Sequence, residues 1–158
     1  MVRIYLPDTS NIEVFLATDY GDVSVLDFSN ANFDINANMG DISVTQANSL
    51  SIASEMGDVS IGDVCKLTVT QDMGDIEVAN VTEKVSIDSE MGNVSIEKLN
   101  LVKDSKIILS LGDLEITSIT NAYVDATTDL GDIEIKNNNR EAAYVLTVES
   151  DMGDVSIG

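Results

Sequence analysis

The hexapeptide Met56-Gly57-Asp58-Val59-Ser60-Ile61 decides the fold, because it returns seven more times along the chain with conservative changes. Eight of the ten glycines lie in these copies, at positions 21, 40, 57, 74, 92, 112, 131 and 153. Successive motif glycines are 17 to 22 residues apart. A short motif that recurs at a nearly constant interval is typical of a repeat protein in which each turn of the chain packs on the one before it.

Apolar residues keep fixed places around each motif glycine. Counted from the glycine as position 0, these places are −7, −5, −1, +2, +4 and +7, and around Gly57 they hold Leu50, Ile52, Met56, Val59, Ile61 and Val64. Alternation within each short run predicts strands with one face turned inward. The alternation changes parity three times per repeat, so we expect three corners that separate one long side from two short ones. The sequence therefore predicts an all-β fold, a parallel β-helix or β-solenoid of about eight rungs of 17–22 residues each.

Two further features describe the inside and the outside of the expected rung. Position −3 should also point inward, yet it holds small or polar residues in most copies, which would let the rung close tightly. All variation in repeat length lies between +7 of one repeat and −7 of the next, which we call the variable corner. Its longest segments are 100–104 and 139–145. Loops on one face of a solenoid are a common place for a binding function.

The chain is expected to form one domain over residues 1–158, with an N-terminal cap at 1–16 and stacked rungs at 17–158. The cap is inferred from aromatic and apolar residues near the N-terminus, which would cover the open edge of the first rung. No equivalent follows at the C-terminus, so we expect Ile157 on an open edge. The native protein would either continue past this edge as a longer chain or pair it with another molecule, which would give a homo-oligomer.

The charge of the chain limits the classes of partner that it is expected to bind. Twenty-eight acidic and 8 basic residues give a formal net charge of −20 at pH 7. A nucleic-acid partner is disfavoured, because nucleic-acid binding needs a basic surface. Direct insertion into a membrane is not expected either, because no apolar run approaches the roughly 20 residues of a membrane-spanning helix. A protein or cell-surface partner and metal cations remain.

Stacking of the repeats would align the motif aspartates in a row, which we call the acidic ladder. Its members are Asp22, Asp41, Asp58, Asp75, Asp113, Asp132 and Asp154. One interpretation is turn chemistry, in which glycine supplies an unusual backbone angle and aspartate accepts bonds from nearby amides. The alternative is a ladder of Ca²⁺ sites, because Ca²⁺ takes oxygen ligands and would neutralise the repulsion between carboxylates. Asn93 favours turn chemistry, because it keeps the acceptor and lacks the charge.

Other residue types give weaker signals. Methionine recurs at position −1, where a soft metal such as Cu(I) could bind, but leucine and tyrosine share this position and a role in the core is expected. Histidine is absent from the sequence, which removes the commonest general base and most zinc sites. Paired carboxylates could hydrolyse a glycoside, but they recur on nearly every rung, whereas a catalytic pair should be singular. We therefore expect no enzymatic activity, no catalytic residue and no cofactor, with Ca²⁺ as the alternative.

Basic residues gather at the variable corner. Those at or next to it are Lys66, Lys84, Lys103, Lys106 and Arg140. They either blunt exposed corners and add solubility or form a second docking edge. The Gly-Asp corner contains no lysine or arginine.

The repeated unit of a hydrophobic residue, Gly-Asp, and alternating Val/Ile and Ser/Glu resembles a bacterial family of unknown function whose members carry a predicted adhesin label. The opening Val2-Arg3-Ile4-Tyr5-Leu6-Pro7 adds to the resemblance, which covers essentially the whole chain. It implies a single-stranded β-helical domain of an extracytoplasmic or cell-envelope protein, and it supplies no catalytic or binding residues. The leading hypothesis is an acidic, non-enzymatic structural or interaction module, a rigid rod that presents the acidic ladder and the variable corner to a partner. A divalent-cation-binding module and a carbohydrate-active enzyme are the second and third.

Overall fold

The computed structural model describes residues 12–26, 28–136 and 143–158, and within these ranges the regular structure is all β-strand, with no helix. The strands are β1 (Glu13–Tyr20), β2 (Val23–Val25), β3 (Phe28–Met39), β4 (Ile42–Met56), β5 (Val59–Met73), β6 (Ile76–Met91), β7 (Val94–Leu111), β8 (Leu114–Leu130), β9 (Ile133–Ile135), β10 (Ala143–Met152) and β11 (Val155–Ile157). Every pairing between them is parallel, in the order β1-β3-β4-β5-β6-β7-β8-β9-β11, with β10 on β8 and β2 on β4.

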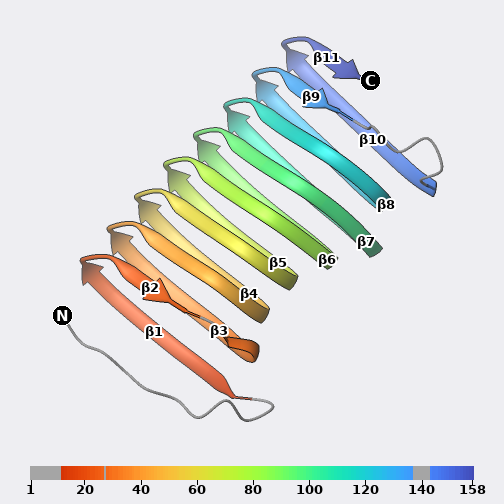
Figure 1. Ribbon diagram of the computed structural model, residues 1–158. Helices are drawn as coiled ribbons and strands as arrows, with labels where there is room; N and C mark the ends of the chain where they lie inside the picture. The colour runs from red at the N-terminus through yellow and green to blue at the C-terminus, as the bar shows by residue number, and fades with distance from the viewer. Residues whose placement is uncertain (1–11, 27, 137–142) are drawn as a thin grey trace.

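Each long strand makes one turn of a β-solenoid. Figure 1 shows the strands rising in one layer, reversing at a tight corner and descending in a second layer that faces the first. The corner is the Gly-Asp pair, and the eight motif glycines mark the limits of about seven turns. Register follows the motif, so that Val59 pairs with Ile76 and Met56 with Met73. The predicted parallel β-solenoid is therefore confirmed.

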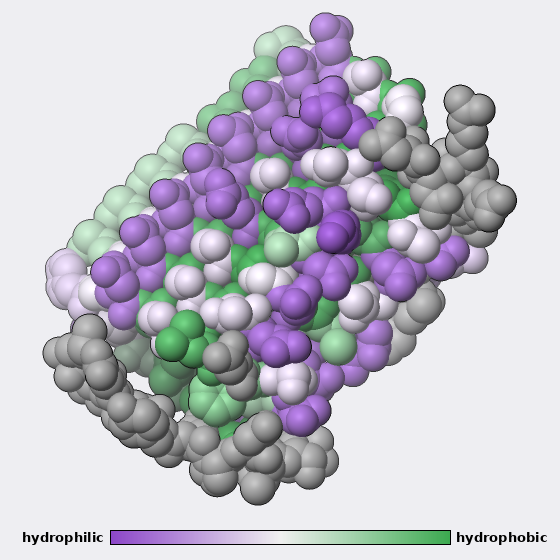
Figure 2. Space-filling view, viewed as in Figure 1, coloured by the Kyte–Doolittle hydropathy of each residue, from purple (hydrophilic) through white to green (hydrophobic). Residues whose placement is uncertain are grey.

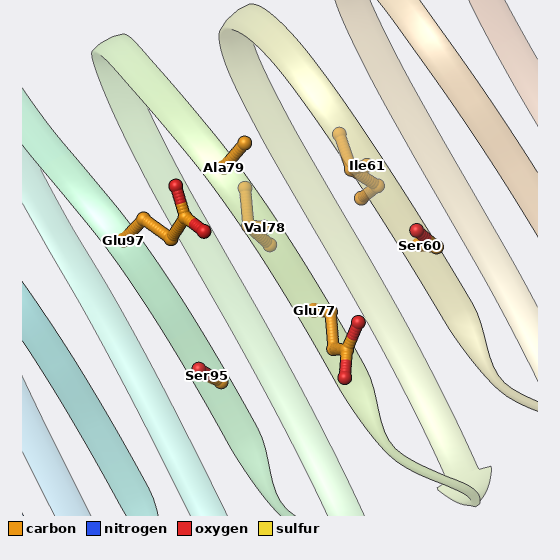
Figure 3. A pocket seen from close by; sticks show the side chains of 7 residues that line it. All are labelled: Ser60, Ile61, Glu77, Val78, Ala79, Ser95 and Glu97. Carbon is orange, nitrogen blue, oxygen red and sulfur yellow. The ribbon is translucent and has the colours of Figure 1, made fainter.

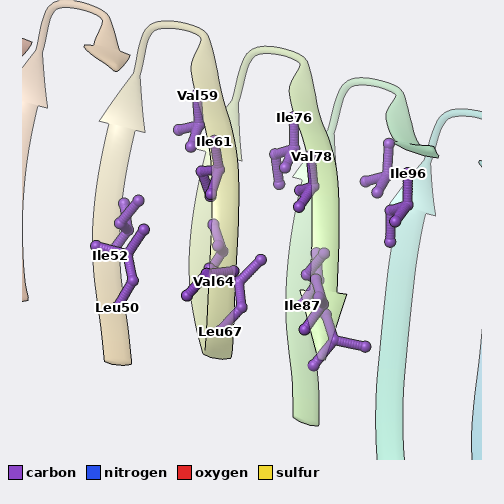
Figure 4. Close-up of a cluster of buried hydrophobic side chains, with 14 of the residues drawn as sticks. Leu50, Ile52, Val59, Ile61, Val64, Leu67, Ile76, Val78, Ile87 and Ile96 are labelled. Carbon is purple, nitrogen blue, oxygen red and sulfur yellow. The ribbon is translucent and has the colours of Figure 1, made fainter. Parts of the chain in front are cut away.

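The core lies between the two layers and follows the predicted spacing. In one turn Val59, Ile61, Val64, Leu67 and Val69 are all buried. Figure 4 shows such side chains meeting in the space between the layers, stacked from turn to turn. Each fully buried side chain of this size contributes about 1.5–3 kcal/mol relative to exposure. Because each turn buries its apolar residues only against its neighbours, stability depends on the whole stack.

The expected three-sided rung needs a correction. Only the Gly-Asp corner interrupts a strand within 28–130, and the other two changes of parity occur inside continuous strands. Where the repeat length varies, the pairing shifts register, as between Val64 and Lys66 and between Val81 and Ser86. The extra residues of the longer turn are thus absorbed by bulge-like irregularities, whereas β4 and β5, whose turns have equal length, pair without a shift. These shifts fall at the variable corner, as predicted.

Most of the expected N-terminal cap, residues 1–11, lies outside the described residues. Its last residues, Glu13 to Leu16, belong to β1 and pair in parallel with Asn32 to Ile35 of β3. They therefore form part of the first turn. The longest expected loop, at 139–145, also lies largely outside the described residues.

Candidate functional site

The Gly-Asp corner is built on a backbone shape that only glycine adopts easily. The motif glycines have φ between 123° and 158°, a region that residues with a side chain rarely occupy. A second constraint is space, because a Cβ atom on Gly57 would run into the carbonyl oxygen of Gly40 in the preceding turn. Gly21, which has no described turn beneath it, meets only the first constraint.

Main-chain bonds tie each corner to the next. The amide of Gly57 donates to the carbonyl oxygen of Met73 at 3.1 Å, and the amide of Val59 donates to the carbonyl oxygen of Asp75 at 2.9 Å. The same pattern recurs at the other corners. The amide between those of Gly57 and Val59 belongs to Asp58. It needs an acceptor other than a main-chain carbonyl oxygen.

The acidic ladder supplies that acceptor. Asp58 Oδ1 accepts the amide of Asp75 at 3.0 Å, and Asp41 Oδ1 accepts the amide of Asp58 at 3.0 Å. Equivalent bonds of 2.8–3.2 Å link every successive pair from Asp22 to Asp154. The aspartates therefore serve the backbone, as the turn interpretation predicts, but with a different partner amide. The bonded amide lies one turn further along the axis, and not in the same turn.

Asn93 takes part in the same row without a charge. Its Oδ1 accepts the amide of Asp113 at 3.0 Å, and its own amide donates to Asp75 Oδ1 at 2.8 Å. The row therefore requires a short side chain with a carbonyl-type oxygen, whether charged or neutral. Within the described ranges, no group of three or more His, Cys, Asp or Glu residues is arranged to hold a metal ion.

Position −1 overturns the prediction of a core role for the methionines. Met56, Met73 and Met91 are 39–43% exposed, because the chain begins to turn after position −3 and directs the next two side chains outward. We call the row at −1 the apolar ridge; it consists of Tyr20, Met39, Met56, Met73, Met91, Leu111, Leu130 and Met152. In Figure 2 a hydrophilic row runs along one edge of the molecule beside a hydrophobic one.

A second acidic row flanks the apolar ridge on its other side. Position −2 holds Asp19, Glu55, Asp72, Glu90, Asp129 and Asp151, all exposed. The ridge therefore runs between this row and the acidic ladder, because five of the eight repeats read acid, apolar residue, glycine, aspartate. The seven ladder aspartates and these six residues surround it with negative charge.

Position −3 is buried from Ala37 to Thr128, as predicted, and some of its polar side chains have a further role that the sequence did not reveal. Gln71 Nε2 donates to the carbonyl oxygen of Gly57 at 2.6 Å, and Thr128 Oγ1 donates to that of Gly112 at 3.2 Å. Ser150 Oγ reaches the carbonyl oxygen of Gly131 in the same way, at 3.0 Å. The acceptor is in each case the motif glycine of the preceding turn. These three side chains thus serve a corner carbonyl, which a sequence pattern alone does not place within reach, whereas the hydroxyls of Ser54 and Ser89 at the same position have no partner.

The lysines of the variable corner are only partly brought together. Lys66 and Lys84 pair in register on β5 and β6, and Lys66 Nζ lies 3.6 Å from Glu83 Oε2. Lys106 lies on β7, opposite Ser86 and Asp125, two residues further along the strand than the pair. The side chains of Lys103 and Arg140 fall outside the described part of the chain.

A separate charged cluster lies on the layer that begins after the Gly-Asp corner, on β8 and at the end of β9. Lys136 Nζ donates to Glu115 Oε1 at 2.8 Å and lies 3.2 Å from Glu134 Oε2. The hydrogen bonds to Glu115 and then Glu134 raise the pKa of Lys136 above its usual value of 10.5. All three side chains are about half exposed, so the cluster contributes little to stability.

A shallow hollow of about 260 Å³ lies on the outer face of β5, β6 and β7. Figure 3 shows Glu77 and Ala79 on β6, with Ser60 on β5 and Ser95 and Glu97 on β7 to either side. Its serines and carboxylates lie on an open strand face, so nothing excludes water from a reacting bond. No helix in the described part of the chain could span a membrane.

Parallel turns, buried apolar rows and a repeated corner define the class as a β-solenoid repeat protein. The profile of the family described as Toastrack DUF4097 matches residues 4–82 and 46–158, and the chain belongs to this family. No curated protein and no solved structure matches the chain. The expected β-solenoid domain of unknown function is thereby confirmed, and its nature fits a structural or interaction module.

Proposed function

We propose that the domain is a non-enzymatic, adhesin-like rod of a bacterial cell-envelope protein, which presents its two edges to a partner. The observation that supports this most is the use of the acidic ladder by the backbone itself. Carboxylates that accept an amide at every corner, such as Asp58 and Asp75, build the scaffold. Function then falls to surfaces that the scaffold displays.

The variable corner supports the same proposal. It alone absorbs insertions, as the register shifts between Val81 and Ser86 show. It also brings positive charge to a chain that is otherwise acidic, through Lys66, Lys84 and Lys106. A rigid rod that varies at one edge resembles other solenoids, whose loops on one face carry binding.

Adhesion of the isolated chain to bacterial envelope material tests this function. Beads coated with the 158-residue chain should bind purified envelope fragments saturably, and the variant Lys66→Ala, Lys84→Ala, Lys106→Ala should lose binding with an unchanged unfolding midpoint. The double variant Asp58→Asn, Asp75→Asn is the control for the other edge. Absence of saturable binding would contradict the proposal. So would release of reducing sugar that stops when Glu77 and Glu97 are changed to Gln, because that result would identify an enzyme.

A further inference from the structure

The apolar ridge is the apolar row of each described turn that the solenoid does not bury. The inward rows of β4 to β8 are 0–5% exposed, whereas Met56, Met73 and Leu111 of the ridge are 39–42% exposed. Directly paired residues such as Met56 and Met73 cover one another along the axis, but only on two sides. Soluble monomers seldom expose a continuous apolar row of this length, and such a row marks an interaction site.

We propose that the apolar ridge binds a cationic amphipathic α-helix of a partner protein. The inference rests on the proposed interaction function and names the chemistry of the partner at this edge. A helix with an apolar stripe would cover the ridge, and lysines or arginines on both flanks of that stripe would meet the acidic ladder on one side and the second acidic row on the other. The negative charge on both sides of the apolar ridge is complementary to positive charge on both flanks of the helix's apolar stripe.

The spacing of the ridge favours a helix over an extended strand. Neighbouring ridge residues are about 4.8 Å apart along the axis, which gives a ridge of roughly 34 Å. A helix advances about 5.4 Å per turn, so its apolar stripe stays close to the ridge residues over several turns. Side chains on one face of a strand repeat at about 6.8 Å and lose register at once. Methionine adapts to the remaining mismatch, because its side chain is flexible and polarisable.

Charge argues against the other occupants. Anionic lipid would be repelled by the acidic rows that flank the ridge, such as those of Glu55 and Asp58. A second copy of this chain would bring the same acidic rows into contact, with a net charge of −20 on each partner. Both occupants are outcomes of the test below.

The test measures binding of the full 158-residue chain to three synthetic peptides by calorimetry. The probe is a helix of about 18 residues, or roughly 27 Å, with leucines on one stripe, lysines on both flanks, and alanine and glutamine elsewhere. A scrambled peptide of the same composition controls for charge, and a third peptide replaces lysine with glutamate. The variant Met56→Gln, Met73→Gln, Met91→Gln removes the centre of the ridge. Tyr123→Gln is its matched control, because Tyr123 is 46% exposed and lies away from the ridge.

The proposal predicts binding of the amphipathic peptide, at least tenfold weaker binding of the scrambled and acidic peptides, and at least tenfold weaker binding by the triple variant. Tyr123→Gln should bind as the unchanged chain does, and both variants should keep their unfolding midpoints. Equal binding of the scrambled peptide, or undiminished binding by the triple variant, overturns it. So does binding to vesicles of phosphatidylcholine and phosphatidylserine that the triple variant loses, or a dimer that only the unchanged chain forms. Such a failure leaves the envelope-adhesion result unaffected, so the two proposals fail separately.

Discussion

Asp58 Oδ1 accepts the backbone amide of Asp75 at 3.0 Å, and these two residues are 17 positions apart in the sequence. The bond runs along the axis of the solenoid and supplies the corner amide with the acceptor that the parallel ladder does not provide. A buried or ladder amide without an acceptor is costly, so the aspartate side chain completes the main-chain bonding of each turn. The negative charge of this edge is a consequence of how the corner is built.

Replacing Asp58 tests this role. Asp58→Ala removes the acceptor and should lower the free energy of unfolding by about 0.5–1.5 kcal/mol, the usual contribution of a single hydrogen bond. Asp58→Asn keeps the acceptor, as Asn93 does, and should change the free energy by less than about 0.5 kcal/mol. Urea unfolding of the three proteins measures the difference. Equal losses in both variants would show that the charge matters and the bond does not.

The glycine of the corner carries two separable constraints. Gly21→Ala strains only the backbone, at φ 123°, and should cost about 1–3 kcal/mol. Gly57→Ala, at φ 137°, adds a clash between the new Cβ and the carbonyl oxygen of Gly40, so it should cost clearly more. Urea unfolding compares them. A smaller loss for Gly57→Ala would mean that neighbouring turns do not pack as closely as described.

The polar side chains at position −3 give a third expectation. Thr128→Val removes the donor to the carbonyl oxygen of Gly112 and leaves that acceptor without it, so a loss of about 1–3 kcal/mol is expected. Ser89 Oγ is buried and has no partner, so Ser89→Ala should be neutral or stabilising. Thermal and urea unfolding distinguish the two. A larger loss for Ser89→Ala than for Thr128→Val would contradict the assigned bonds.

Lys136 gives an expectation in alkaline solution. Its hydrogen bonds to Glu115 and Glu134 raise the pKa of Lys136 in the folded state above the 10.5 of the unfolded chain. Its contribution is therefore complete below pH 10.5 and is lost as the pH rises through the folded pKa. The difference in unfolding midpoint between the unchanged chain and Lys136→Gln should be small near neutral pH and should vanish at high pH. A difference that grows with pH would show the opposite sign.

Much of the fold could be predicted because the repeat contains its own register. Spacing from −7 to +7 is constant, so the repeat pattern alone assigns Leu50, Ile52, Val59 and Ile61 to the core, where all four are buried. Confining length variation to one segment also placed the variable corner. Both inferences need only the period-two pattern and the interval between glycines.

The corner itself could not be predicted to the same depth. Parity placed Met56 inward, but parity assumes a straight strand, and the chain leaves the strand direction between Ser54 and Gly57. The acceptor of Gln71 and the axial bond of Asp58 depend on which atom of the next turn lies opposite. That relation is set by the stacking of turns and is not written in any one repeat.

The aspartates of the Gly-Asp corner accept backbone amides of the next turn, and we predict that their role needs no bound cation. Thermal unfolding in Ca²⁺, in Mg²⁺, and in EDTA with NaCl matched for ionic strength tests it most directly, because a ligand of the folded state must raise the midpoint. We expect the unchanged chain to have the same midpoint in all three solutions, and likewise the double variant Asp58→Asn, Asp75→Asn. A rise specific to Ca²⁺ that the double variant loses would contradict it.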